Sequence, residues 1–550
     1  MYASHVFTNA ALWRPDDVSG ADTLAVADGV IISVGRGVDR ALLGPATEVH
    51  DLGGASLLPG FIDAHVHPVA GGLAALRCDL SELPHTRRGY LDAIAAYARA
   101  HPDEPVISGS GWYGDAFVGG LPTCGDLDEV IADRPVVLSS HDGHGVWVNS
   151  EALRRVGIDA STPDPSGGRI ERDAHGTPTG ILFERAGDPA NALIPDYDEA
   201  FLRRALLIAQ QRLHAAGVTG WQDAGVDIPA FGLSDTLATY LAADAAGELT
   251  ARVCGALWWA ADEGVGQLDT LRERRAQGRG HRFHVDTVKV MQDGICENCT
   301  AAMLAPYSDL PAGASPTGLS FIDPAELAQV CALLVRNDFH IHMHAVGDRA
   351  VRECLDALGA AWSARPGFDA RHQIAHLDVV DPADIPRFAQ LGVIANIQAL
   401  WARRDTEIVE RKLPLLGPDR EPFHFPFGSI RAEGGALAMG SDWPVTDPNP
   451  LWAIHTAVHR TGSIADPHAI GDDARTVPLV AGEAITLRAA VDAYTVGSAR
   501  AMHAEDRAGS LSVGKDADLV VLDEDIRTAV DIGALTSTMT MVGGTVVHAI

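Results

Sequence analysis

Short apolar runs of strand length recur through the middle of the chain and alternate with segments of helical periodicity. In one such segment, "EAFLRRALLIAQQRLHAAG", Leu202, Leu206 and Leu213 fall on one helix face, and Gly217 is placed to end the helix. Eight strands with helical crossovers predict an α/β fold, a (β/α)8 barrel of the TIM type, with functional side chains at the carboxyl ends of its strands. The apolar runs cover residues 57–67, 218–223, 251–258, 285–291, 339–344, 372–376, 393–397 and 436–440.

The first crossover of this barrel is much longer than one helix requires. Residues from about 69 to 199 have a periodicity of their own and include the turn-rich stretch "STPDPSGGR". Connections of this length in compact domains are usually functional, for example as lids or binding loops. We therefore expect a large insertion after the first barrel strand, forming a lid or subdomain over the barrel mouth.

The two ends of the chain each carry short β-rich segments. Near the start, "TLAVADGVIISVG" reads as a hairpin that turns at Asp28-Gly29, and near the end "TMTMVGGTVVHAI" turns at Gly543-Gly544. Because neither segment buries a face alone, we expect them to pack together as one composite β-sandwich. The predicted organisation is residues 1–56 and 506–550 in the sandwich and residues 57–505 in the barrel.

Composition and charge narrow the classes of function. Of 550 residues, 47% are hydrophobic and 21% charged, which is typical of a soluble globular protein, and the formal net charge is -31. Such an acidic chain disfavours nucleic acid and anionic membranes as partners. No apolar run reaches the roughly 18 residues of a membrane span, and "MYASHVFTNAALWRPDD" lacks the features of a signal peptide, so we expect a cytoplasmic protein.

Two histidines stand one residue apart at the end of the first strand, in "LLPGFIDAHVHP". Residues i and i+2 of a strand point to the same face, so His65 and His67 both project into the predicted barrel mouth. There the two imidazoles can bind one cation, because imidazole nitrogen is a preferred ligand of zinc and related metals. The spacing therefore indicates a metal site.

Other predicted strand ends also carry side chains that can bind a metal. His344 ends "FHIHMH", His376 ends "RHQIAH", and Asp442 follows "GALAMGS"; imidazole and carboxylate are the ligand types of hydrolytic metal sites. Lys289, at the end of "HVDTVKVMQDG", is predicted to be buried, where its charge is costly without a partner.

With these motifs the sequence resembles the amidohydrolase superfamily, in the branch called amidohydrolase family 3, which includes N-substituted formamide deformylase-like proteins. The resemblance covers nearly the whole chain and rests on a specific set of segments: "LLPGFIDAHVHP", "SHDGHGVWVNSEAL", "VKVMQDG", "HMHAVGDRAV", "RHQIAHLDVVDPADIPRFAQLGVIANIQ", "GSDWPV" and "GSLSVGKDADLVVLD". It implies a distorted barrel flanked by a composite β-sandwich, and a hydrolase that acts on a non-peptide C–N bond of a small-molecule amide.

The resemblance also implies one or two divalent metals, zinc first among them. By position the ligands are His65, His67, His344, His376 and Asp442, and Lys289 matches a lysine that is carboxylated in many relatives and then bridges two metals. In the implied mechanism a metal-activated water attacks a polarised carbonyl, and Asp442 carries a proton from that water to the leaving nitrogen.

Each of these residues has an alternative structural interpretation. His65 and His67 could cap the barrel mouth through hydrogen bonds, Lys289 could pair with Asp293, and Asp442 could cap a following helix. His340 and His342 share a strand face with His344 and are interpreted as core groups in deeper barrel layers.

Three residues of the insertion are candidates for contact with substrate. His144, in "HDGHGVWVNS", lies in a segment that the family places near the substrate, and Trp112 and Tyr113, in "GSGWYGDAF", could form an apolar pocket wall.

Two other classes of function stay open at this stage. A non-catalytic ligand-binding or regulatory protein could keep the same fold, although it would not need Asp442. Among the seven cysteines, which suit reduced thiols, Cys296 and Cys299 have CxxC spacing; thiol ligation to the metal, or a redox protein built on the pair, is the remaining alternative. A homodimer is the commonest oligomer for such an enzyme.

Overall fold

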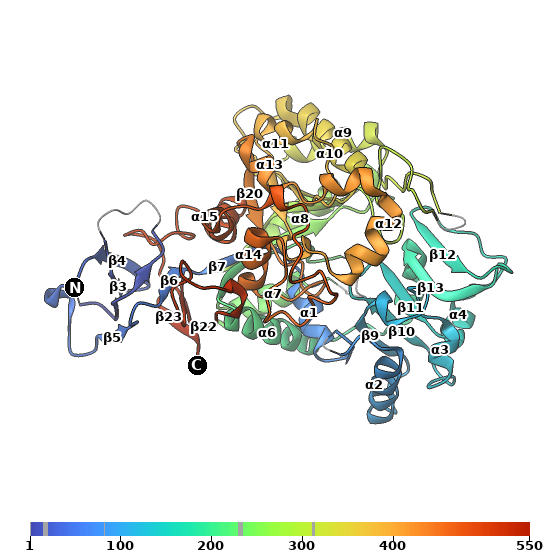
Figure 1. Cartoon of the computed structure of the whole chain (residues 1–550), viewed down its shortest axis with the longest axis horizontal. Helices are drawn as coiled ribbons and strands as arrows, with labels where there is room; N and C mark the ends of the chain where they lie inside the picture. The colour runs from blue at the N-terminus through green and yellow to red at the C-terminus, as the bar shows by residue number, and fades with distance from the viewer. Residues whose placement is uncertain (1, 15–19, 82, 229–234, 311–313) are drawn as a thin grey trace.

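The computed structural model describes residues 2–14, 20–81, 83–228, 235–310 and 314–550. Its centre is a barrel in which eight strands pair in sequence order, every pair parallel, as predicted from the alternation of apolar runs and helices (Figure 1). The strands are β7 (Phe61–Val66), β14 (Val218–Asp223), β15 (Arg252–Trp258), β16 (Phe283–Met291), β17 (His340–Ala345), β18 (Gln373–His376), β19 (Ile394–Ile397) and β20 (Ala436–Met439).

The barrel closes just beyond the end of its last strand. The amide of Asp442 donates to the carbonyl of His65 at 2.7 Å, and the amide of His67 donates to the carbonyl of Trp443 at 2.8 Å. The first and last strands are therefore joined at their carboxyl ends, next to the predicted metal-binding side chains.

One predicted strand is two strands in the structure. The run 57–67 was expected to form one barrel strand, but it breaks at Gly60 into β6 (Ser56–Pro59), which belongs to the sandwich, and β7. The break requires glycine, because a Cβ at residue 60 would lie 2.2 Å from a side-chain atom of Thr219. His67 lies just past β7 and precedes helix α1 (Pro68–Ala74).

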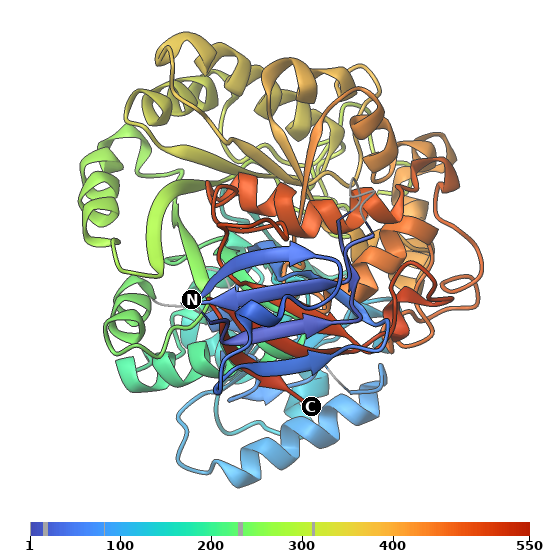
Figure 2. The ribbon, with the colours of Figure 1, turned by 90° about the vertical axis from the view of Figure 1, so that its left-hand side faces the viewer.

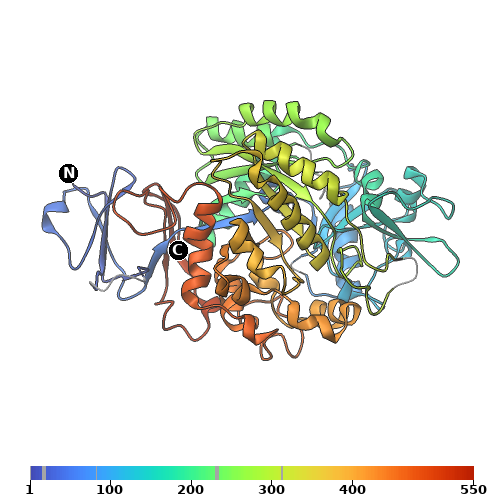
Figure 3. The same ribbon diagram turned by 90° about the horizontal axis from the view of Figure 1, so that it is seen from above.

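Helices cover the outside of the barrel (Figure 3). In α6 (Glu199–Ala215) the predicted face is buried, with Leu202, Leu206 and Leu213 in the main apolar core, and Gly217 after the helix has φ 86°. The others around the barrel are α7 (Leu237–Ala245), α8 (Leu268–Gln277), α9 (Pro324–Arg336), α10 (Asp348–Ala361), α11 (Ile385–Leu391), α12 (Leu413–Leu416), α13 (Phe427–Ala432), α14 (Pro450–His459), α15 (Leu487–Asp492) and α16 (Ser498–Ala501).

Both ends of the chain build one β-sandwich, which confirms the predicted composite (Figure 2). Phe7 and Leu24 of the first sheet pack with Leu57, Leu519 and Met541 of the second. The first sheet holds β4 (Val30–Gly35), β3 (Thr23–Ala27), β1 (His5–Thr8) and β5 (Glu48–Asp51), and the second holds β2 (Ala11–Leu12), β6, β21 (Leu519–Leu522), β22 (Ser537–Val542) and β23 (Thr545–Ala549).

The long first crossover contains a sheet of its own, at the end of the barrel away from the sandwich (Figure 1). An apolar core that includes Tyr90, Ile94 and Trp147 holds the sheet and its helices together. The strands, in spatial order, are β12 (Gly168–Arg172), β13 (Pro178–Glu184), β11 (Gly145–Val148), β10 (Val136–Ser140), β9 (Ile107–Trp112) and β8 (Cys78–Asp79), and the helices are α2 (Arg87–Ala100), α3 (Cys124–Asp128), α4 (Ser150–Val156) and α5 (Asp188–Asn191). Across the described part of the chain, no helix combines the length and apolarity that crossing a membrane requires.

Candidate metal centre

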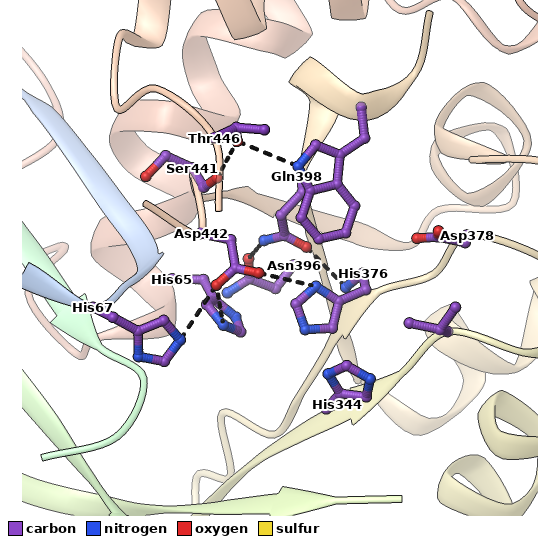
Figure 4. Close-up of polar contacts among 12 residues, drawn as sticks. His65, His67, His344, His376, Asp378, Asn396, Gln398, Ser441, Asp442 and Thr446 are labelled. Atoms are coloured by element: carbon purple, nitrogen blue, oxygen red, sulfur yellow. Dashed lines mark hydrogen bonds and ion pairs between the residues drawn. The ribbon is translucent and has the colours of Figure 1, made fainter. Parts of the chain in front are cut away.

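The structure brings the six predicted metal-site residues together in one cavity at the carboxyl ends of the barrel strands. All of them except Lys289 are labelled in Figure 4. The carboxylate of Asp442 lies between the first two histidines: its Oδ1 is 3.2 Å from Nε2 of His65 and 3.3 Å from Nε2 of His67. Its other oxygen is 3.9 Å from Nδ1 of His376. Strand ends far apart in the sequence thus supply one compact set of nitrogen and oxygen donors.

Lys289 and His344 complete this set from β16 and β17. The Nζ atom of Lys289 lies 3.3 Å from Nε2 of His65. The ring of His344 is 4.3 Å from that of His376 between centroids, and its Nε2 lies 3.2 Å from the carbonyl oxygen of Gly294. All six side chains are buried.

The donor set fits a divalent cation. One nitrogen or oxygen from each of His65, His67 and Asp442 lies within 4.8 Å of the other two. Nδ1 of His376 is buried and has no hydrogen-bond partner within the described chain. A buried polar atom normally has such a partner, so this nitrogen is available to bind a metal. Imidazole and carboxylate are ligand types of zinc, and a carboxylated Lys289 would add an anionic oxygen.

Burial sets the protonation states that metal binding requires. Burial lowers the pKa of His65, His344 and His376 well below the usual histidine value, so the imidazoles are neutral and can donate a lone pair. Burial also lowers the pKa of Lys289 to about 8, against the opposing influence of Asp442. For Asp442 burial alone would raise the pKa, but the hydrogen bond to His67 and the charges of neighbouring groups lower it overall.

Two of these residues have backbone conformations that residues other than glycine rarely adopt. His376 has φ 79° and Asp442 has φ 57°, both in the left-handed region. Such strain persists only where surrounding contacts impose it, and it is frequent at functional sites. For His376 one such contact is the side chain of Gln398, whose Oε1 accepts a hydrogen bond from the His376 amide at 2.8 Å (Figure 4).

A layer of supporting residues was not identified from the sequence. Nε2 of His342 lies 2.8 Å from Nδ1 of His65, and Nδ1 of His342 lies 3.2 Å from the side-chain oxygen of Gln222. His342 is therefore a core group, as interpreted from its strand face, and it also orients a metal-site histidine. The alternation in "HIHMH" places it one layer below His344, but the sequence does not show its contact with His65.

The structure also bears on the alternative interpretations. The carboxylate of Asp293 accepts hydrogen bonds from the amides of Ala302, Val346 and Gly347 rather than pairing with Lys289. The helix that follows Asp442, α14, begins with Asn449 as its cap.

The paired cysteines lie in an apolar cluster and do not line the cavity. Burial raises the pKa of Cys299 to about 11 and that of Cys296 well above its usual value, which opposes formation of the thiolate. The structure therefore gives no support to thiol ligation or to a redox pair.

The cavity around the six residues has a volume of about 500 Å³, and the insertion supplies part of its wall. His144, between β10 and β11, lines it, and its Nδ1 lies 2.9 Å from a carboxylate oxygen of Glu184. Burial lowers the pKa of His144, but Glu184 raises it more, to about 9. Glu184 thus favours the protonated form of His144, whose ring lies 5.5 Å from that of His344 between centroids.

The two aromatic residues predicted as a pocket wall lie elsewhere. Trp112 is in the core of the insertion, where its indole N–H donates to the carbonyl of Leu138 and its ring packs against Trp147. Trp112 does not line the metal-site cavity. Tyr113 lines a neighbouring cavity, stacked on His141 with ring centroids 3.8 Å apart.

Comparison with known proteins shows the family and the fold. Residues 48–548 match the sequence profile of the amidohydrolase family. The protein LONG AFTER FAR-RED 3 of Arabidopsis thaliana is 30% identical, over 94% of this chain and 87% of that protein. An N-substituted formamide deformylase of Arthrobacter pascens is 28% identical, over 92% of this chain and 91% of that protein. A solved metal-dependent hydrolase of Pyrococcus furiosus shares the fold, with a TM-score of 0.68 and 24% identity over 95% of this chain and 99% of that one. The chain belongs to the amidohydrolase family.

Proposed function

We propose that this chain is a metal-dependent hydrolase that cleaves a non-peptide C–N bond of a small amide. The observation that carries the proposal is the convergence of four histidines, a lysine and an aspartate from separate barrel strands on one cavity. Membership of the amidohydrolase family supports hydrolysis as the reaction class. The bond and the substrate are our inference.

The residues that would hold the metal are His65, His67, His376 and Asp442, with His344 and a carboxylated Lys289 available for a second ion. A divalent cation bound there supplies Lewis-acid chemistry, because it polarises a carbonyl oxygen and lowers the pKa of water. The chain itself contributes the neutral imidazoles and the ionised carboxylate described above.

Asp442 is the group best placed to move a proton. Its pKa is low, so the carboxylate is ionised at neutral pH and can accept a proton from the attacking water. The same carboxyl group can then donate that proton to the nitrogen that leaves. His144, fixed by Glu184 and charged, can donate a hydrogen bond from its second ring nitrogen to the oxygen on which negative charge develops.

The first substrates to test are N-substituted formamides, because the relative from Arthrobacter pascens carries that activity in its name. We would purify the protein without chelator and with bicarbonate, measure metal per chain by elemental analysis, and follow amine release from formamides and acetamides of the same amines. Hydrolysis that is lost with a chelator and restored by zinc supports the proposal. A protein that binds no metal even after reconstitution would contradict it. A fully metal-loaded protein that hydrolyses none of these amides would instead favour a non-catalytic ligand-binding role.

A further inference from the structure

A second, smaller cavity of about 110 Å³ lies beside the metal-site cavity. Asp142 and Val445 line both cavities, so the two cavities lie next to each other. Trp401 lines the second cavity and stacks on His376 of the metal centre, with ring centroids 5.3 Å apart and planes 5° apart. A molecule with its reacting bond at the metal centre could therefore extend one end into the second cavity.

Carboxylates outnumber cationic side chains around this second cavity. Lys412 is shared by two of them: its Nζ lies 2.5 Å from Oδ2 of Asp378 and 2.9 Å from Oε1 of Glu297. Arg403 is likewise shared by Asp405 and by Asp466 behind it. Each of these two buried cations thus serves two carboxylates, which leaves an excess of negative charge at the cavity wall.

Two carboxylate oxygens on this wall lack a partner. Oδ1 of Asp378 and Oε2 of Glu407 are buried, and nothing in the described chain donates a hydrogen bond to either. Asp378 is only 2% exposed, and both residues line the cavity. Figure 4 shows Asp378 beyond His376, on the side away from His65 and His67. A buried acceptor without a donor is costly, so these oxygens point to a ligand that supplies positive hydrogen-bond donors.

The electrostatic balance at Glu407 agrees with this deficit of positive charge. Burial raises its pKa to about 8 even though Arg411 acts against the rise, and the carboxylates of Glu297 and Asp142 add to it. An ammonium group near these oxygens would offset the repulsion among the carboxylates and would favour the ionised form of Glu407 at neutral pH.

Part of the wall is apolar and fits a carbon chain, although histidine and threonine side chains also line the cavity. Ile295, Leu400 and Ile408 line the cavity together with the rings of Tyr113 and Trp401. An organic cation matches both features, because its carbon chain contacts the apolar side chains while its charge meets the carboxylates and the aromatic faces.

We infer that the second cavity binds a positively charged end of the substrate, such as an alkylammonium or amidinium group carried on the substituent of the amide. The placement of the scissile amide at the metal centre rests on the proposed function. The cation-binding property of the cavity does not, and it can be measured without turnover.

The direct test is calorimetric titration of the full chain at neutral pH with three molecules of equal length: n-pentylammonium, 1-pentanol and pentanoate. We expect n-pentylammonium to bind at least about tenfold more tightly than 1-pentanol, and pentanoate to bind most weakly. Glu407→Gln and Asp378→Asn should each weaken the binding of n-pentylammonium by about tenfold and leave the binding of 1-pentanol unchanged. Asp269→Asn, at a side chain that is 87% exposed in α8, is the matched control and should change nothing. Equal binding of the ammonium and the alcohol, tighter binding of pentanoate, or no binding of n-pentylammonium overturns the inference.

A second experiment separates this inference from the proposed function. N-(4-aminobutyl)formamide and N-pentylformamide offer the same bond with and without a charged end. A kcat/KM about tenfold higher for the charged compound, lost in Glu407→Gln, supports both proposals. Equal hydrolysis of the two overturns the cation site and leaves the proposed function standing. If neither is hydrolysed but n-pentylammonium binds selectively, the hydrolase proposal fails while the cation site holds.

Discussion

The carboxylate of Asp63 accepts hydrogen bonds from both the amide and the hydroxyl of Ser441, at 3.0 and 2.6 Å. The same carboxylate accepts the amide of His65 at 3.1 Å. Asp63 lies in the first barrel strand, and Ser441 directly precedes Asp442 at the end of the last strand. One buried side chain therefore fixes the position of His65 relative to Asp442, and with it the geometry of the metal centre.

Replacing Asp63 should loosen this junction. In Asp63→Ala the amide and hydroxyl of Ser441 lose their buried acceptor, at a cost of about 1 to 3 kcal/mol for each unsatisfied group. Ser441→Ala removes only the hydroxyl and should cost less. We would measure unfolding in urea and zinc affinity for both variants. Asp63→Ala should lose stability and zinc affinity together, and equal zinc affinity in Asp63→Ala and the parent would show that Asp63 does not position the ligands.

The hydrogen bond between His342 and His65 predicts an effect on metal affinity. His342→Phe leaves Nδ1 of His65 without its partner, and loss of such a supporting contact typically weakens metal binding about 10- to 100-fold. The matched control is His340→Phe, on the same face of β17 but stacked on Phe368 and away from the metal-site residues. Zinc titration with a competing chelator separates the two variants. Similar losses in both would mean that His342 acts only through packing.

Much of the barrel could be predicted from the sequence, for a physical reason. Each of its strands is an apolar run bounded by helix and turn signals, and the ligand histidines fall at the ends of those runs, where i and i+2 share a face. The break at Gly60 was missed, because it depends on the approach of Thr219 from a strand more than 150 residues away.

The supporting contacts and the second cavity were not predictable in the same way. Asp63 and His342 look like any buried polar residues until the barrel closes and brings Ser441 and His65 against them. The sequence alone does not place Trp112, because an aromatic residue beside a loop has the same local pattern whether it faces a cavity or packs in the core of the insertion.

The role proposed for Asp442 predicts a separation between metal binding and turnover. Asp442→Asn keeps the size and one oxygen of the side chain but cannot accept the proton, so kcat should fall by about 10²- to 10⁴-fold while most of the metal is retained. His65→Ala, which removes a ligand nitrogen, should lose metal and activity together. Elemental analysis and steady-state rates on the best formamide give both quantities, and an Asp442→Asn variant nearly as active as the parent would refute the proton transfer.

The state of Lys289 predicts the number of metal ions. With bicarbonate present, a carboxylated Lys289 should support about two equivalents of zinc per chain, and Lys289→Met should hold about one. Asp269→Asn serves as the control for general effects of substitution. The mass of the intact protein under mild conditions should show one added carbon dioxide in the parent and none in Lys289→Met. One equivalent of zinc in both proteins would indicate an unmodified lysine.

Buried neutral histidines predict that the fold weakens in mild acid. Burial lowers the pKa of His214 from 6.5 to about 4, and its two ring nitrogens bond to Val218 and Thr250. The unfolded chain therefore takes up a proton at His214 before the folded one does, so this part of the stability is complete above pH 6.5 and is lost as the pH falls towards 4. A pKa difference of this size between the folded and unfolded chain corresponds to about 3 kcal/mol in the free energy of unfolding. In His214→Asn the amide can still donate to the carbonyl of Val218 but cannot titrate. Urea unfolding at several pH values between 7 and 4 should give a shallower loss of stability in this variant than in the parent. Parallel curves for the two proteins would show that His214 does not contribute to the acid sensitivity.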